Sequence, residues 1–372
     1  LVSFKLKTKP KLGVGKIRVD ASSGSEKAYH EIEIAVRNPN QPFVDVKSKV
    51  IQANNEWEIK FEPNGMEGTN EATLEISRIP PIDFGRRLGF LIRYPYGCIE
   101  QSVSAVFPQL FVADVMEIDG NQQSEMQSNI NQAIKRIEKF VTTDGGLSYW
   151  PGHEDANAWG TTYGYHFLLE ADKKGYYVPS TLLNQINRFQ QQRARTWTST
   201  NSNNYYQSDL IQAYRLYTLA LANNPDLGAM NRLREKPDLS TQAKWRLAAA
   251  YAIAGQPEAA NDIIENTSTE IKDYRELSGS YGSTLRDQAM ILETLNLLNL
   301  DKEGALIART ISEQLSSQRW LSTQTTAYAL IAISKFVENN NDSGEITASY
   351  SLNAEQERRI KSDAFITQIN LK

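Results

Sequence analysis

The 372-residue sequence contains one cysteine, Cys98, and three histidines, His30, His153 and His166. A single cysteine excludes an intramolecular disulfide and a zinc site built on cysteine clusters. We therefore expect no metal and no other cofactor. No apolar run approaches the roughly 18 residues that a transmembrane helix needs. The formal charge is only −4, which argues against nucleic acid or an anionic membrane surface as the main partner.

The composition is that of a folded globular chain, because 40% of the residues are hydrophobic and 23% are charged. At about 150 residues per domain, the length predicts two or three domains. The chain opens at Leu1 with neither an initiator methionine nor a signal peptide. We therefore expect it to be a piece of a longer protein.

Both ends of the chain show the pattern of β-strands. Apolar and polar residues alternate in 29–36, 56–61 and 72–79, which indicates strands with one buried face. The same alternation returns in 346–352 and 364–371. We expect these segments to form a partial antiparallel β domain that is split by the middle of the chain.

The middle of the chain has the pattern of helices. Six segments are apolar nearly all round, which is typical of helices buried on most sides. These segments are 98–118, 161–171, 208–222, 241–255, 285–298 and 323–334. More polar stretches lie between them and predict outer helices, at a spacing typical of helical-hairpin repeats. The predicted fold is therefore mostly α, an α/α toroid of six helical hairpins inserted into the partial antiparallel β domain.

The domain boundaries follow these changes of pattern. Residues 1–80 are predicted to form a β region that holds the preceding strands and the first part of the split β domain. Residues 81–338 form the toroid. Residues 339–372 begin with the polar linker NNNDSG and then supply the return strands.

Cys98 lies in the sequence YPYGCIEQ, where Pro95 and Gly97 end a strand-like run and the cysteine opens the first helix. A thiol at a helix N-terminus faces unpaired N–H groups and the positive end of the helix dipole, both of which favour the thiolate. Gln101 lies three residues later, on the same side of the helical turn. The sulfur can therefore reach the side-chain amide carbon of Gln101, and loss of ammonia would give an internal thioester.

This Cys-x-Glu-Gln sequence, preceded by Pro-Tyr-Gly, resembles the thioester motif of the α2-macroglobulin and complement family, in its bacterial branch. Pro95, Tyr96, Gly97 and Glu100 complete the motif around the cysteine and glutamine. The stretches that also resemble the family are 78–111, 145–152, 159–171 and 175–179. The resemblance covers roughly residues 70–338 and implies that the split β flanks are the family's CUB domain.

The resemblance implies a function in which Cys98 supplies the sulfur and Gln101 the acyl carbon of a thioester, while Glu100 has no assigned role. The family traps proteases: cleavage of a bait region elsewhere exposes the thioester, and a nucleophile such as a protease lysine becomes covalently bound. This is stoichiometric acyl transfer by an endopeptidase inhibitor, so we expect no enzyme. The implied partners are target proteases and other domains of the full-length protein. The implied location is the periplasm or cell envelope, in bacterial defence, with any membrane anchor outside this chain.

A thioester needs shielding from water, and aromatic side chains are the natural shield. The candidates are Tyr149, Trp150, Trp159 and Tyr163. Ordinary hydrophobic packing at a helix entry explains the same residues equally well. In some complement proteins a histidine takes over the acyl group, and His153 is the weakly placed candidate for that role.

Three alternatives remain at this point. A cysteine hydrolase would pair Cys98 with His166 or His153 and with Asp155, but it leaves Gln101 without a role. A family member whose thioester never forms would only bind a partner. An α/α-toroid enzyme acting on a glycan or an isoprenoid would use polar residues of the inner helices. Its candidate residues are Asp209, Tyr214, Arg286 and Asp287.

Overall fold

The computed structural model describes residues 3–6, 13–36, 45–49, 51–63, 65, 69–77, 95–116, 118, 120–198, 208–317, 319–339, 345–353, 355–363 and 366–371. Most of the predicted linker and the first part of the stretch 78–111 lie outside these residues. The chain divides into two compact units, one made of Leu1–Glu75 with Gln368–Lys372 and the other of Ile76–Thr367. We call them unit 1 and unit 2. The predicted boundaries at 80 and 338 stay predictions.

Unit 1 contains a long antiparallel hairpin of β1 (Gly13–Ser23) and β2 (Glu26–Val36), which confirms the strand predicted at 29–36. Ile17 lies opposite Ile32 on one face, and Lys16 pairs with Glu33 on the other at 2.8 Å between Nζ and Oε1. Strand β1 was not predicted, because two glycines interrupt its alternation.

The other strands mostly lie where the pattern places them. Strand β3 (Ala72–Ser77) pairs with β6 (Ile366–Leu371), and in unit 2 β4 (Ile346–Tyr350) pairs with β5 (Arg358–Ser362). The predicted strand at 56–61 is wrong, since this segment is described without strand structure. Alternation makes a strand only where a neighbouring strand accepts and donates the ladder hydrogen bonds, and none of the strands in the described part pairs with 56–61.

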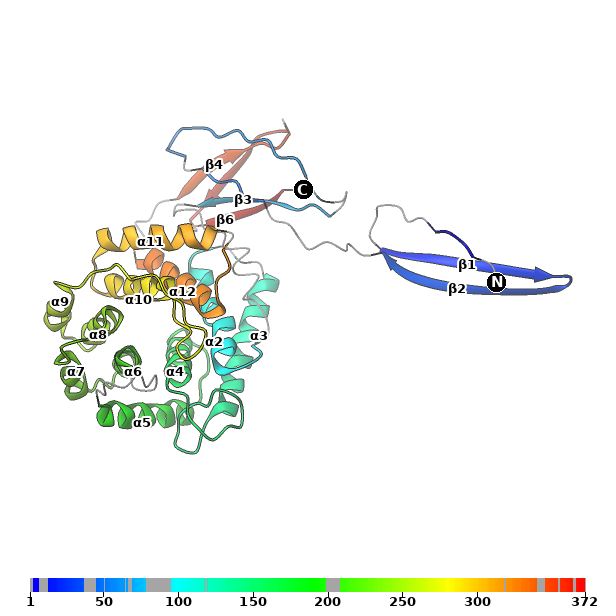
Figure 1. Ribbon diagram of the computed structural model, residues 1–372. Helices are drawn as coiled ribbons and strands as arrows, with labels where there is room; N and C mark the ends of the chain where they lie inside the picture. The colour runs from blue at the N-terminus through cyan, green and yellow to red at the C-terminus, as the bar shows by residue number, and fades with distance from the viewer. Residues whose placement is uncertain are drawn as a thin grey trace. The chain divides into compact units, whose positions relative to one another are not determined.

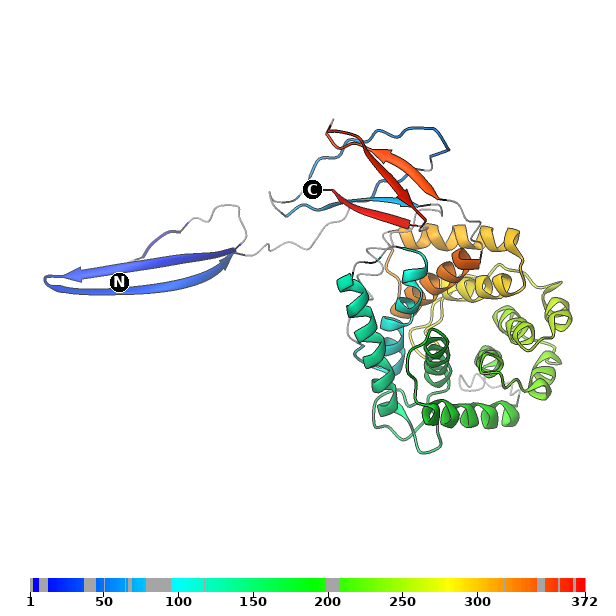
Figure 2. The same ribbon diagram turned by 180° about the vertical axis from the view of Figure 1, so that it is seen from behind.

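Unit 2 is built from helices in two layers, and the mostly α prediction is confirmed. The inner helices are α2 (Ile99–Val106), α4 (Ala158–Lys173), α6 (Asp209–Leu221), α8 (Thr241–Ile253), α10 (Thr284–Leu297) and α12 (Thr323–Asn339). The outer helices are α3 (Gly120–Ile137), α5 (Ser180–Thr196), α7 (Leu227–Arg234), α9 (Pro257–Ile264) and α11 (Asp301–Ser316). Each inner helix contacts the next, and α12 contacts α2, so the contacts run in a closed cycle (Figures 1 and 2).

Four of the six inner helices start with a polar N-cap residue. A short polar residue stands at the N-cap of α4, α6, α8 and α10, and its side-chain oxygen accepts a hydrogen bond from the backbone N–H three residues later. These caps are Asn157, Ser208, Ser240 and Ser283. They satisfy N–H groups that would otherwise be orphaned where the helices enter the core.

Three 3₁₀ turns complete the described helical structure, at Pro108–Leu110, Val112–Asp114 and Glu138–Phe140. The first begins at Pro108, which ends the helix that Cys98 opens because proline has no backbone N–H to continue it. None of the helices in the described ranges is both long and apolar enough to span a bilayer.

Candidate functional site

Cys98 is the N-cap residue of α2 and only 1% of it is exposed. The next residue, Ile99, donates its backbone N–H to the carbonyl of Tyr149 at 3.1 Å. The Ile99 side chain fits against two glycines of α4, because a Cβ on Gly160 would lie 2.5 Å from its Cγ2 and one on Gly164 would lie 3.5 Å from its Cδ1. Larger residues on α4 would push this turn away.

The turn before Cys98 is held by an arginine from the outer layer. Arg136 of α3 donates from Nη2 to the carbonyl of Gly97 at 2.8 Å and from Nε to Ser102 Oγ at 3.1 Å. Ser102 Oγ in turn donates to the carbonyl of Tyr96 at 3.3 Å. Sequence reasoning missed Arg136, because a basic residue in the last turn of a polar helix resembles an ordinary surface residue.

Gly97, the residue before the cysteine, leaves room for the side chain of the motif glutamine. Its φ of +86° lies in the left-handed region that favours glycine. A Cβ at this position would lie 2.0 Å from Oε1 and 3.1 Å from Cδ of Gln101. The Gln101 amide therefore folds over the residue that immediately precedes Cys98.

Burial raises the pKa of the Cys98 thiol above its ordinary value. The Tyr149 hydroxyl and the backbone N–H of Gln101 act in the opposite direction, while the charge of Glu100 adds to the increase. The predicted help from the helix N-terminus is therefore present, but desolvation outweighs it. The expectation that the thiolate is favoured here is wrong.

Glu100, for which the sequence suggests no role, connects the motif to the neighbouring inner helices by hydrogen bonds. It is buried, and its Oε1 accepts hydrogen bonds from Ser104 Oγ at 2.9 Å and from Thr323 Oγ1 at 3.1 Å. Thr323 is the first residue of α12. Ser104 also shares a hydrogen bond of 3.2 Å with the Tyr163 hydroxyl. The motif carboxylate thus positions α2 against both α12 and α4.

The four candidate shield residues separate into two pairs. Tyr149 lies beside the cysteine, since its carbonyl accepts the hydrogen bond from the backbone N–H of Ile99, and burial raises the pKa of its hydroxyl. Trp150 meets the Tyr149 ring edge-on at 5.5 Å between ring centroids and is 45% exposed. Trp159 and Tyr163 are fully buried instead: the first packs beside Tyr214 and the second stacks on Tyr328, with centroids 5.2 Å apart in each pair.

His153 lies exposed in the loop that follows Trp150, to whose carbonyl its backbone N–H donates at 3.3 Å. Tyr149, Gln101 and Glu100, rather than this histidine, are the residues that shift the pKa of the Cys98 thiol. Its role in acyl transfer stays a prediction.

The site can now be compared with known proteins. A model of the family described as the A-macroglobulin TED domain matches residues 83–209, which include the cysteine and the glutamine of the motif. The chain is 28% identical over 324 residues to the α2-macroglobulin of Escherichia coli K12, covering 82% of this chain and 19% of the relative. It is 27% identical over 346 residues to that of Xylella fastidiosa Temecula1, covering 87% of this chain and 21% of the relative. The chain is thus similar to bacterial α2-macroglobulins.

Solved structures agree with this assignment. Salmonella α2-macroglobulin reacted with methylamine superposes with a TM-score of 0.70 at 26% identity, over 97% of this chain and 24% of that one. Native E. coli α2-macroglobulin, at 24% identity and a TM-score of 0.70 over the same shares of the two chains, shows the same fold. This α2-macroglobulin-like chain thus spans about a fifth of the length of its curated relatives.

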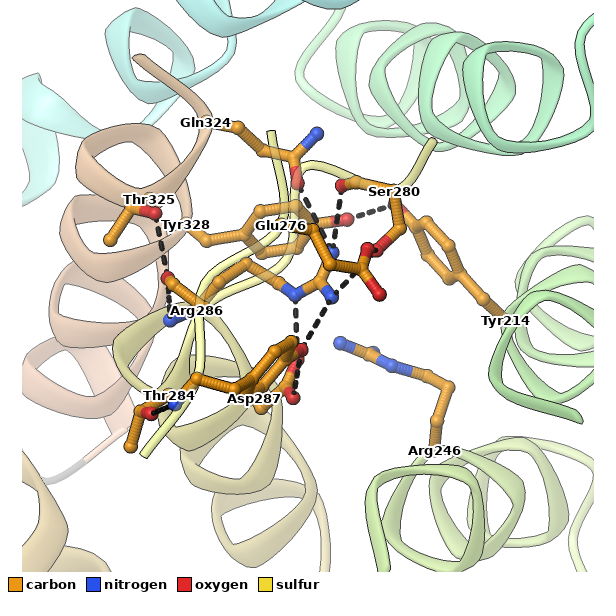
Figure 3. Close-up of polar contacts among 12 residues, drawn as sticks. Tyr214, Arg246, Glu276, Ser280, Thr284, Arg286, Asp287, Gln324, Thr325 and Tyr328 are labelled. Atoms are coloured by element: carbon orange, nitrogen blue, oxygen red, sulfur yellow. Dashed lines mark hydrogen bonds and ion pairs between the residues drawn. The ribbon is translucent and has the colours of Figure 1, made fainter. Parts of the chain in front are cut away.

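The residues considered for a toroid enzyme serve the fold of the α2-macroglobulin-like chain. Asp209 accepts a hydrogen bond from the backbone of Ser240 at 2.7 Å, and Arg286 donates to Asp287 at 2.6 Å between Nε and Oδ1. Tyr214 accepts from Tyr328 inside the ring (Figure 3). Across the described ranges, no group of three or more His, Cys, Asp or Glu residues could hold a metal ion. The enzyme alternative is not favoured.

His166 is a core histidine of α4. It is fully buried, and burial lowers the pKa of its ring. Its Nδ1 lies 2.8 Å from the hydroxyl of Tyr214, and its Nε2 lies 3.6 Å from Oε1 of Glu170. These partners lie inside the closed cycle of inner helices, so the geometry does not favour a Cys98–His166 pair.

Proposed function

We propose that Cys98 and Gln101 form an internal thioester in this chain. The observation that carries the proposal is the Gln101 amide folded over Gly97, directly beside the buried cysteine. The sulfur adds to Cδ of Gln101, the C–N bond breaks, and ammonia leaves with the thiol proton. Because the thiol is buried and its pKa is raised, we attribute this reaction to the close fit of the turn rather than to a free thiolate.

We propose further that the thioester captures proteases. A lysine amine of the protease adds to the acyl carbon, the C–S bond breaks, and the sulfur leaves with the electron pair, so an amide joins the two proteins. Each thioester reacts once, so the chain acts stoichiometrically as an endopeptidase inhibitor and not as an enzyme. Two structures of one relative support this: E. coli α2-macroglobulin activated by porcine elastase and by trypsin. The Salmonella relative was solved after reaction with methylamine, a small amine, which also supports the proposal.

The rest of the proposal concerns the longer protein. The relatives are bacterial proteins of about five times this length. We therefore expect this chain to contact further domains of the same protein, one of which carries a bait region. We propose that the β-strands around the helical domain form a split CUB domain. We also propose the periplasm or cell envelope as the location and bacterial defence as the role.

Intact mass and thiol titration test the thioester directly. The purified chain is expected to be lighter than its encoded mass by one ammonia, and to show no titratable thiol until methylamine is added. Methylamine should then release one thiol and add its own mass, since the amine takes the acyl group.

Two variants control this result. Gln101→Asn shortens the side chain by one methylene and should leave Cys98 titratable from the start. Gln123→Asn makes the same change on the exposed face of α3 and should behave as the wild type. The proposal is contradicted if the wild-type chain has its encoded mass, a freely reactive thiol and an intact glutamine at 101.

A further inference from the structure

Arg136 fixes the backbone on the side of the chain that precedes the cysteine. Its Nη2 donates to the carbonyl of Gly97 at 2.8 Å, and its Nε donates to Ser102 Oγ at 3.1 Å. Ser102 Oγ donates in turn to the carbonyl of Tyr96 at 3.3 Å. The Gly97 carbonyl belongs to the peptide bond that joins Gly97 to the cysteine, so one guanidinium fixes this peptide bond relative to the first turn of α2.

The same stretch of chain also fixes the backbone on the other side of the cysteine. Ile99 donates its backbone N–H to the carbonyl of Tyr149 at 3.1 Å. The Arg136 guanidinium lies over the ring of Phe140, with 5.5 Å between Cζ and the ring centroid. The Phe140 carbonyl accepts from the backbone N–H and the hydroxyl of Ser148, at 2.8 and 3.0 Å. The groups that hold the two sides of the cysteine are thus connected to each other.

Gly97 makes this restraint necessary. A glycine fits here because the Gln101 amide occupies the space that a Cβ would need. Glycine adopts positive and negative φ about equally readily, so the residue that admits the amide does not by itself fix the turn. A hydrogen bond from a charged donor is among the stronger ones in proteins, and the Gly97 carbonyl accepts one from Arg136. Arg136 therefore supplies the rigidity that Gly97 lacks.

The neighbouring residue shows what the arginine has besides its charge. Lys135 and Arg136 both lie in the last turn of α3, so each interacts with the same end of the helix dipole. Lys135 is exposed, whereas Arg136 is half-buried and bonds the turn before the cysteine. The two cations therefore match in charge and helix position and differ in their contacts with the motif.

We propose that Arg136 is a positioning residue for thioester formation, which fixes the Gly97 turn so that the sulfur stays directed at the acyl carbon. This rests on the proposed function. In the step that Arg136 speeds, the sulfur adds to Cδ of Gln101, the C–N bond breaks, and ammonia leaves with the thiol proton. The rate of such a step depends steeply on geometry, and a misplacement of about 1 Å can cost about 100-fold. Loss of Arg136 therefore slows the step without changing the reacting groups.

The experiment measures how fast newly made full-length chains lose one ammonia, by isotopic pulse labelling in the producing cells and intact mass. Arg136→Met is expected to lose it about tenfold more slowly than the wild type, because hydrogen bonds from a charged donor are removed. Arg136→Lys keeps the charge and one donor group, and is expected to be about threefold slower. Lys135→Met is the matched control and should keep the wild-type rate. An equal slowing in Lys135→Met would overturn the proposal.

A pH profile distinguishes positioning from an effect of charge on the thiol. In Gln101→Asn the Cys98 thiol is expected to stay free, and its alkylation by iodoacetamide followed against pH reports the pKa of that thiol. Adding Arg136→Met should leave the midpoint of this profile unchanged, because the arginine acts through the backbone. A midpoint that rises would show that the positive charge had favoured the thiolate, and would overturn the positioning role.

The possible outcomes separate the two proposals. If the wild type loses ammonia and Arg136→Met loses it equally fast, the positioning role is wrong and the thioester stands. If the wild type never loses ammonia, the proposed function fails, and the turn is tested by hydrogen exchange of the backbone amides of 97–102. Faster exchange in Arg136→Met than in Lys135→Met then supports the restraint on the turn, and equal exchange overturns it. If the melting temperature shows that Arg136→Met does not fold, Arg136→Lys decides by the same comparisons.

Discussion

Gly97→Ala is expected to abolish the thioester. The new methyl group would lie 2.0 Å from Oε1 of Gln101, far inside van der Waals contact, and would force the amide away from the cysteine. The φ of +86° adds strain for any residue with a Cβ. Titration of the purified variant should give a free Cys98 thiol, and its mass should be the encoded mass of the variant.

The chain offers a matched control for the backbone strain. Gly175 has a φ of +87°, yet a Cβ at that position would meet nothing within 4 Å. Gly175→Ala therefore carries the same strain without the clash, and is expected to cost about 1 kcal/mol of stability while leaving the thiol blocked. A blocked thiol in Gly97→Ala would contradict the proposed geometry, and a free thiol in Gly175→Ala would show that strain alone is responsible.

Lys335→Met is expected to destabilise unit 2 strongly. Lys335 of α12 bonds Glu170 of α4 and lies 3.0 Å from Oε1 of Glu293 of α10, so one ammonium neutralises two buried carboxylates. Among the described residues, Arg246 is the second cation of this group, at 2.9 Å from Oε2 of Glu293. Breaking such a buried group by removing one partner costs about 3–5 kcal/mol. Urea unfolding at pH 7 followed by circular dichroism measures the loss.

The pH dependence of this loss identifies its cause. Burial alone would raise the pKa of Glu293, but the charges of Lys335 and Arg246 hold it at about 2, below its usual value of 4.5. Stabilisation from such a lowered pKa is fully present above pH 4.5 and disappears as the pH falls toward 2. The difference between Lys335→Met and the wild type should therefore shrink over that range.

The control for Lys335 is an exposed ion pair. Arg309 and Glu313 on α11 are 3.1 Å apart, with side chains that are 73% and 63% exposed. Arg309→Ala should change stability little, because solvent-exposed pairs contribute little. A loss for Lys335→Met that stays constant from pH 7 to pH 3 would mean that packing, and not the unpaired carboxylates, is responsible.

Local sequence patterns predict the helices of unit 2 well, because the inner helices are apolar nearly all round and four of them start at a short polar cap. The pair Cys98 and Gln101 could also be found, since i and i+3 spacing is a local property. The prediction of a strand at 56–61 is wrong because strand formation depends on a partner strand that is distant in the sequence. The expectation of a Cys98 thiolate is wrong for a related reason. The burial that raises the pKa of this thiol is produced by residues far away in the sequence.

The same limit applies to the supporting residues of the site. Arg136, Tyr281 and Thr323 have no motif that marks them. The packing of the helices brings them to their partners Gly97, Tyr149 and Glu100, which lie in or beside the motif. Trp159 and Tyr163 were named as a shield on their aromatic character alone. The structure places them in the ring interior, where that character serves packing.

The closed cycle of helices also has a consequence for the order in which the protein is made. Thr323 follows its partner Glu100 by 223 residues, and Tyr281 follows Tyr149 by 132. A ribosome adding about 5–20 residues per second needs roughly 10 to 45 seconds to produce the α12 end after the cysteine turn. During that time Glu100 lacks the hydrogen bond from Thr323 that holds the cysteine turn against α12. The reactive bond is therefore expected to form late, after the last inner helix has joined the first, so that a nascent chain does not carry an unprotected acyl group past the amines of the cell.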